Sequence, residues 1–121
     1  MRVAVTSQGD QLDSDVDPRF GRAKFFIVLD TDSEGHQVVD NSQNLNAAQG
    51  AGVQAAQIVA DLNVDVVMTG HCGPRAFSVL EAAGIKVYLG LEGTVQSAIE
   101  RLKSGEFEEA EADGPSVQGH W

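Results

Sequence analysis

The sequence predicts one α/β domain built as three layers, in which helices flank a mixed sheet of about five strands. Its 121 residues suit a single hydrophobic core. Short continuous apolar runs are typical of buried strands, and in the second half of the chain such runs alternate with segments of helical periodicity. This alternation predicts parallel strands joined by right-handed crossovers, with helices on the faces of the sheet.

The first half of the chain predicts strands. Residues Met1–Thr6 contain a short apolar run, and Lys24–Asp30 contain the strongest strand signal, an unbroken run of large apolar residues. The turn residues Thr31–Gly35 then predict a hairpin with a partner strand at Gln37–Asp40. We expect the strand at Lys24–Asp30 to run antiparallel to the strands on both sides of it.

The second half predicts helices and strands in alternation. We expect helices over Ala47–Leu62, Pro74–Ala83 and from the capping residue Thr94 to about Lys103, with intervening strands at Asp65–Thr69 and Ile85–Leu89.

Individual residues mark the ends of these helices. Pro74 suits a first helical turn, where its missing N–H is not needed, and Asn63 and Gly84 are suitable stops. Gly50 and Gly52 weaken the first turns of their helix, but they also allow another backbone or a ligand to approach closely.

The composition is that of a folded globular protein, with 42% hydrophobic and 21% charged residues. A formal net charge of -10 disfavours binding to nucleic acid or to an anionic membrane. No segment approaches transmembrane length, and the single Cys72 excludes an intramolecular disulfide, so we expect a cytoplasmic protein. We expect residues 1–105 to form the domain and residues 106–121 to form an acidic, flexible tail.

The loop Gly70–His71–Cys72–Gly73 is the strongest candidate site. It follows a predicted parallel strand, at the sheet edge where α/β proteins bind ligands, and it precedes a helix whose start favours anions. That environment should lower the pKa of Cys72 and give a thiolate, a soft metal ligand, with His71 as a second ligand. The alternative is that Cys72 is a small buried hydrophobe and His71 is simply solvated.

The segment Asp17–Arg22 provides a second candidate constellation. Arg19 and Arg22 can neutralise an anion if this segment folds beside the His–Cys loop. Alternatively, they pair with Asp13, Asp15 or Asp17. Asn44 can face the same ligand, although amides in loops are often turn-formers.

Conventional catalytic sites fit the sequence poorly, so we do not expect an enzyme. A cysteine phosphatase loop has an arginine six residues after its nucleophile, where this chain has Ser78. A metal-dependent nuclease needs clustered carboxylates, and the first predicted strand contains none. Two ligands such as His71 and Cys72 cannot complete a zinc site, whereas a preassembled cluster needs fewer protein ligands.

Five segments together resemble the dinitrogenase iron-molybdenum cofactor biosynthesis family, in order and in spacing: MRVAV, DPRFGRAKFF, NLNAAQGAG, VDVVMTGHCGPRAF and GIKVYLG. The resemblance covers roughly residues 1–105 and implies a ribonuclease H-like fold. It also implies binding, storage or transfer of an anionic metal–sulfur cluster or its precursor, in cofactor biosynthesis or metal homeostasis.

As a short stand-alone domain, the chain is most similar to the orange-protein-like branch of that family. This implies a noncovalently held molybdenum-containing cluster with copper sulfide or iron sulfide. Expected partners are the cluster and a cofactor-assembly or acceptor protein, with the chain a monomer or weak dimer. The alternative is a non-catalytic regulatory or interaction module of the same fold, whose acidic tail docks on a basic partner.

Overall fold

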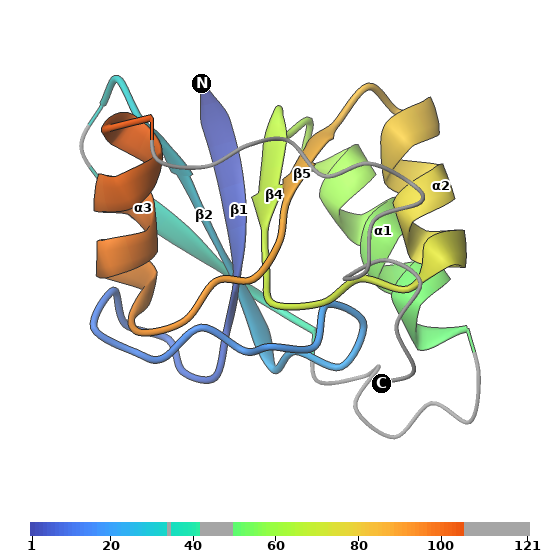
Figure 1. Ribbon diagram of the computed structural model, residues 1–121, viewed down its shortest axis with the longest axis horizontal. Helices are drawn as coiled ribbons and strands as arrows, with labels where there is room; N and C mark the ends of the chain where they lie inside the picture. Colours follow the sequence, from blue (N-terminus) through green and yellow to red (C-terminus); the bar gives the residue numbers. More distant parts are fainter. Residues whose placement is uncertain (34, 42–49, 106–121) are drawn as a thin grey trace.

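The computed structural model describes residues 1–33, 35–41 and 50–105, so the expected tail lies outside the described residues. The elements follow the predicted order (Figure 1): β1 (Arg2–Ser7), β2 (Phe25–Asp30), β3 (His36–Asp40), α1 (Ala51–Asp61), β4 (Val66–Met68), α2 (Pro74–Ala82), β5 (Lys86–Tyr88) and α3 (Val95–Lys103).

The five strands form one mixed sheet in the order β3-β2-β1-β4-β5. The strands β1, β4 and β5 are parallel, and β2 runs antiparallel to both β1 and β3, as the sequence predicts. On the central strand, Val5 pairs with Ile27 on one side and with Met68 on the other. The carboxyl ends of the parallel strands therefore meet at one edge of the sheet.

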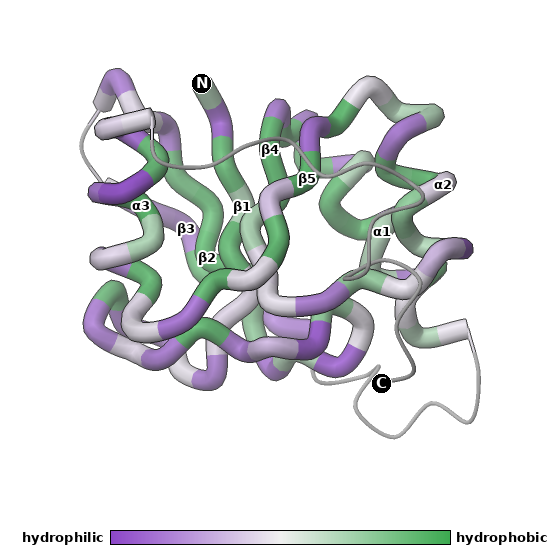
Figure 2. Tube along the Cα trace, viewed as in Figure 1, coloured by the Kyte–Doolittle hydropathy of each residue, from purple (hydrophilic) through white to green (hydrophobic). Residues whose placement is uncertain are grey.

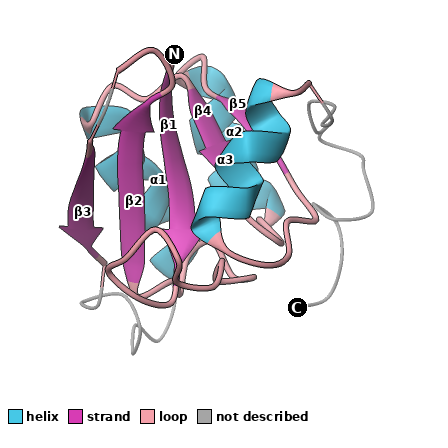
Figure 3. Ribbon diagram, turned by 90° about the vertical axis from the view of Figure 1, so that its left-hand side faces the viewer, coloured by secondary structure: helices cyan, strands magenta, loops and turns pink. Residues whose placement is uncertain are grey.

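Helices cover both faces of this sheet, which confirms the three-layer prediction (Figure 3). The helices α1 and α2 pack on one face and α3 on the other. Successive side chains of β1 point to opposite faces of the sheet: Ala4 faces α1 and α2, whereas Val3 and Val5 face α3. Because both faces are covered there, β1, β2 and β4 are mostly buried and apolar, and Figure 2 shows much of them in the green of hydrophobic residues. The edge strand β3 is mostly exposed and more polar.

The helix ends follow from local backbone chemistry. The helix α1 begins at Ala51, later than the predicted Ala47, because Gly50 has a positive φ of 80° that is incompatible with a helical turn. Asn63 and Gly84 have φ values of 58° and 76° just beyond the ends of their helices, as expected of stop residues.

The long segment between β1 and β2 crosses the carboxyl edge of the sheet, as Figure 1 shows. Val16 donates to the carbonyl oxygen of Gly93 at 2.8 Å, and Val95 donates to that of Ser14 at 2.9 Å. Farther along, the N–H of Phe20 donates to the carbonyl oxygen of His71 at 3.1 Å. The segment thus contacts the exit loop of β5 and then that of β4.

No helix in the described ranges is both long enough and apolar enough to span a bilayer.

Thr94 caps α3, as the sequence predicts: its Oγ1 accepts a hydrogen bond from the N–H of Ser97 at 3.1 Å. We expect Thr94→Ala to lower the free energy of unfolding by about 1 kcal/mol, because the first turn loses this acceptor. Urea denaturation would measure the change, with Thr94→Ser as a control that keeps the hydroxyl. Equal losses in both variants would contradict a capping role.

Candidate functional site

A groove opens at the carboxyl edge of the sheet, between the segment 17–22 and the starts of α1 and α2. Its larger part encloses about 490 Å³ and is lined by residues 19–22, residues 50–52, His71 and Gly73. An adjoining part of about 370 Å³ extends along residues 73–76 to Val53. The two parts share wall residues and form one continuous site, which we call the carboxyl-edge groove.

Glycines bring the backbones around this groove into direct contact. A Cβ atom added to Gly21 would lie 2.7 Å from both the backbone N and the Cα of Gly52. A Cβ atom added to Gly70 would lie 2.7 Å from the Cα of Pro18. Neither contact leaves room for a side chain, so these glycines allow the segment 17–22 to pack against α1 and against the exit of β4. The sequence-based expectation of a close approach at Gly52 is confirmed.

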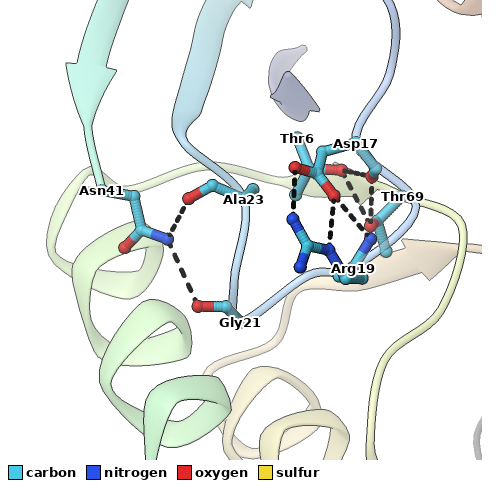
Figure 4. A network of polar contacts seen from close by, with 7 residues as sticks. All are labelled: Thr6, Asp17, Arg19, Gly21, Ala23, Asn41 and Thr69. Carbon is cyan, nitrogen blue, oxygen red and sulfur yellow. Dashed lines mark hydrogen bonds and ion pairs between the residues drawn. The ribbon is translucent and has the colours of Figure 1, made fainter. Parts of the chain in front are cut away.

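Buried hydroxyl groups hold one end of the segment 17–22 (Figure 4). The Thr6 hydroxyl donates to the carbonyl oxygen of Asp17 at 2.7 Å and lies 2.8 Å from the hydroxyl of Thr69. Both threonines are fully buried. They lie at the ends of β1 and β4, so the segment is attached directly to the centre of the sheet.

A buried amide holds the other end of the segment. The Asn41 side chain donates to the carbonyl oxygen of Ala23 at 2.8 Å and to that of Gly21 at 3.4 Å. Asn41 is fully buried, although it follows an exposed edge strand. Sequence reasoning missed this residue, whose only signal is an amide placed directly after a strand.

Arg19 fits both interpretations that the sequence allows. A parallel bridge pairs it with His71, so the segment does fold beside the His–Cys loop. Its Nε also lies 3.3 Å from Oδ1 of Asp17, which is the acidic pairing offered as the alternative. Because the Arg19 side chain is 57% exposed and that of Asp17 only 4%, the carboxylate orients the guanidinium from below and leaves its outer side accessible.

The lining of the carboxyl-edge groove is basic in an acidic chain. Arg19, Arg22 and Arg75 line its two parts, and among the residues that the structure describes no carboxylate does so. The chain has only eight basic residues against 18 acidic ones, so this separation of charge is pronounced. Arg75 was not anticipated, because its place in the first turn of α2 becomes informative only once the groove is known.

The starts of α1 and α2 add to the positive potential of the groove. They follow Gly50 and Gly73, which have no side chains to cap the first turns, and neither first turn contains an acidic residue. The positive ends of the helix dipoles and their N–H groups therefore face the groove, an arrangement that favours an anion.

Cys72 lies beneath the groove rather than in its wall. Its side chain is fully buried in the core that contains Phe20 and Phe77, and the sulfur contacts the carbonyl oxygen of Gly73 at 3.7 Å. Burial raises the pKa of the Cys72 thiol to about 12. The expected lowering of this pKa is therefore wrong, because desolvation of the thiolate outweighs the field of the nearby helix start.

The remaining candidates have different positions. His71 is half-buried and lines the groove, as does Gly73, whereas Gly70 packs against Pro18. Asn44 lies outside the described residues. Within the described ranges, no group of three or more histidine, cysteine or acidic side chains is arranged to hold a metal ion. Metal ligation by His71 or Cys72 stays a prediction.

Comparison with known proteins gives a consistent set of relatives. Residues 1–105 match the family model described as dinitrogenase iron-molybdenum cofactor. The apo form of the orange protein from Desulfovibrio gigas is 45% identical, with a TM-score of 0.88 over 90% of this chain and 92% of that chain.

Two further relatives span nearly the whole chain. A putative NifB protein from Thermotoga is 37% identical, with a TM-score of 0.80 over 98% of this chain and 97% of that chain. An uncharacterized protein of Methanocaldococcus jannaschii is 25% identical over 114 residues, or 92% of each sequence. The mixed α/β fold with its five-stranded sheet is thus shared with proteins of the same size.

The contact between Gly21 and α1 predicts a large effect of a single methyl group. We expect Gly21→Ala to lower the free energy of unfolding by about 2–3 kcal/mol, because the methyl group meets backbone atoms that can move only with the whole helix. Gly73→Ala is a matched control, since Gly73 has a φ of -65° and open space around it. Similar denaturation midpoints for the two variants would refute the proposed close contact.

The raised pKa of Cys72 predicts an unreactive thiol in the folded protein. At pH 8 we expect an aromatic disulfide reagent to modify native Cys72 on the order of 100-fold more slowly than the unfolded chain, because the buried thiol stays protonated. Release of the coloured thiolate with and without denaturant measures both rates. Since the folded pKa of about 12 exceeds the usual 9.0, this group should also favour the folded state below pH 9, and that contribution should decline as the pH rises further.

Proposed function

The chain belongs to the dinitrogenase iron-molybdenum cofactor family, and from this premise we propose that it binds an anionic metal–sulfur cluster in the carboxyl-edge groove. The family connects the chain with the binding or biosynthesis of a cofactor of the iron–molybdenum type. We propose that the bound cargo is a molybdenum-containing cluster with copper sulfide or iron sulfide, or a precursor of such a cluster. The protein stores this cargo or transfers it, and performs no catalysis on it.

The observation that carries the proposal is the composition of the groove wall. Three arginines and two helix starts face one groove, which no carboxylate of residues 1–33, 35–41 or 50–105 lines, in a chain of net charge -10. Core packing does not require this arrangement, because Arg19 and Arg75 are exposed side chains. An anionic ligand would compensate the clustered positive charge through charge-assisted hydrogen bonds.

The walls also suit a sulfur-rich anion in particular. Phe20, Val53 and Ala76 add apolar surface beside the arginines, and glycines at positions 21, 50, 52 and 73 leave the backbone accessible. Sulfide is a large, polarizable anion that accepts weak hydrogen bonds and tolerates apolar neighbours better than phosphate does. A preassembled cluster needs few ligands from the protein, which agrees with the sparse set of metal-binding side chains among the described residues.

His71 and Cys72 have unequal parts in this proposal. His71 lines the groove and can reach a metal of the cluster directly. Cys72 would have to leave the core and lose its proton before it could ligate, because it is fully buried with a raised pKa. We therefore propose noncovalent retention by arginines and backbone N–H groups, with His71 as the first candidate for a direct metal bond.

Storage or transfer implies a second protein that supplies or receives the cluster. We propose a cofactor-assembly or acceptor protein in this role. The groove is open at its outer side, where the exposed Arg19 and Arg75 lie, so cargo can pass to such a partner without unfolding of the domain.

Reconstitution tests the proposed function. Apo-protein mixed with tetrathiomolybdate and copper should develop visible charge-transfer absorption that saturates at a fixed ratio of cluster to chain and stays with the protein through gel filtration. The control is an unrelated acidic protein of similar net charge. Uptake no greater than that of the control would refute cluster binding.

Substitutions then locate the site. We expect Arg19→Gln and Arg22→Gln each to weaken retention about tenfold, the effect of losing one charge-assisted contact. Lys103→Gln is the matched control, because it removes the same charge from α3 on the other face of the sheet. Cys72→Ser should retain the cluster less well if the thiol ligates it, and unchanged retention would reduce Cys72 to a packing residue.

A further inference from the structure

The carboxylate of Asp17 lies beneath the carboxyl-edge groove, where its hydrogen bonds go to a single residue. Its Oδ1 accepts from the backbone N–H of Arg19 at 3.0 Å and from Nε of Arg19 at 3.3 Å, and its Oδ2 accepts from Nη2 at 3.5 Å (Figure 4). The Asp17 side chain is only 4% exposed, and in the described part of the chain its one ion pair is with Arg19. The negative charge of Asp17 is therefore compensated by Arg19 rather than by solvent.

The guanidinium of Arg19 is shared between Asp17 and the groove. Arg19 lines the larger part of the groove and also a second pocket of about 320 Å³, whose wall includes Asp17 and Lys24. Lys24 does not replace Arg19 beside Asp17, because its ammonium lies over the Phe25 ring, 5.7 Å from the centroid. The Nε and Nη2 contacts exceed the roughly 2.7–2.9 Å of a tight charge-assisted pair, so the guanidinium keeps part of its capacity to donate to a ligand.

A shared guanidinium discriminates between kinds of anion. An oxyanion is compact and strongly hydrated, so it binds tightly only where several strong N–H donors replace its water. A sulfide-rich anion is larger, more polarizable and a weaker hydrogen-bond acceptor, so it needs fewer such donors. Because Asp17 accepts from Arg19 and offsets part of its charge, the groove offers an oxyanion less than it would with an unpaired arginine at this position.

We propose that Asp17 is a positioning residue that gives the groove its preference for sulfide-rich anions over oxyanions of the same charge and shape. It acts through Arg19, which it keeps partly neutralised from beneath the groove. Abundant hydrated anions such as phosphate then compete poorly with the cargo. This role rests on the proposed function and adds to it the residue that sets specificity.

Asp17 also has a local structural role, which an asparagine would retain. Its Oδ1 accepts the N–H of the residue two positions ahead, which is the hydrogen bond of an Asx turn. An asparagine forms the same turn through its amide oxygen. Asp17→Asn is therefore close to isosteric, and it removes the negative charge while it keeps the turn.

Isothermal titration calorimetry with tetrathiomolybdate and with molybdate tests the proposal. Both are tetrahedral dianions, so the direct Coulombic effect of a substitution largely cancels in the ratio of their dissociation constants. We expect the original chain to prefer tetrathiomolybdate at least about tenfold. Asp17→Asn should reduce this preference about fivefold, mainly through tighter binding of molybdate.

Asp13→Asn is the matched control. It removes the same charge from an exposed position in the same segment between β1 and β2, and it should leave the ratio unchanged. Partial loss of folding would weaken the binding of both anions alike, so a merely structural role of Asp17 would not move the ratio either.

The part of Arg19 is tested with Arg19→Gln and with the double variant Asp17→Asn/Arg19→Gln. If Asp17 acts through the guanidinium, these two variants should show the same ratio to within about twofold. A ratio that falls as far without Arg19 as with it would refute this route.

Two failures can be told apart. An original chain that binds neither tetrathiomolybdate nor the reconstituted cluster would overturn the proposed function, and the role of Asp17 with it. Binding of tetrathiomolybdate with an unchanged preference in Asp17→Asn would overturn the role of Asp17 alone.

Discussion

Direct contact between backbones, without intervening side chains, is the constraint on which the functional end of this molecule depends. Gly21 lies against the first turn of α1, and Gly70 lies against Pro18. These contacts place the segment 17–22 between two helix starts and the exit of β4. If either glycine carried a side chain, the segment would move away from the helices, and the arginines and the helix N–H groups would no longer face a common space.

The charge distribution has opposite effects at long and short range. With 18 acidic and eight basic residues, the chain as a whole repels anions. The carboxyl-edge groove has the opposite local character, because Arg19, Arg22, Arg75 and the helix starts line it. At physiological salt the distant repulsion is screened over about 8 Å, whereas contacts inside the groove are screened much less. The positive potential of the groove is therefore a short-range property that the net charge does not reveal.

Most of the fold could be predicted because its signals act within a few residues. Pro74 at a helix start, Gly84 at a helix end and Thr94 as a cap each act on the adjacent turn, and the structure places all three as expected. The apolar runs of β1 and β2 likewise report burial on both faces of the sheet. Within the described residues, the antiparallel direction of β2 also followed from the hairpin and the sheet order.

The candidate site could be predicted only in part, because its geometry depends on residues far apart in the sequence. The sequence alone does not decide whether Arg19 lies beside His71, and the structure pairs the two in a parallel bridge. The sequence predicts a lowered pKa for Cys72, whereas burial raises this pKa. The helix start that would lower the pKa is adjacent to Cys72 in the sequence. Phe20, which helps to bury the sulfur, is far from Cys72 in the sequence, so its effect leaves no local signal. The hydrogen bond from the Asn41 side chain to the carbonyl oxygen of Gly21 joins residues about 20 positions apart, so no local sequence pattern predicts it.

The attachment of the segment 17–22 at both of its ends has a consequence for the kinetics of loading. Thr6 and Thr69 hold its beginning and Asn41 holds its end, so its backbone would lose little conformational entropy on binding the proposed cargo. Only the outer parts of the arginine side chains remain to be ordered. Under the proposed function, loading of such a preorganised site would approach a simple encounter between protein and cargo. A protein built in this way would exchange the proposed cargo repeatedly while its fold stays constant.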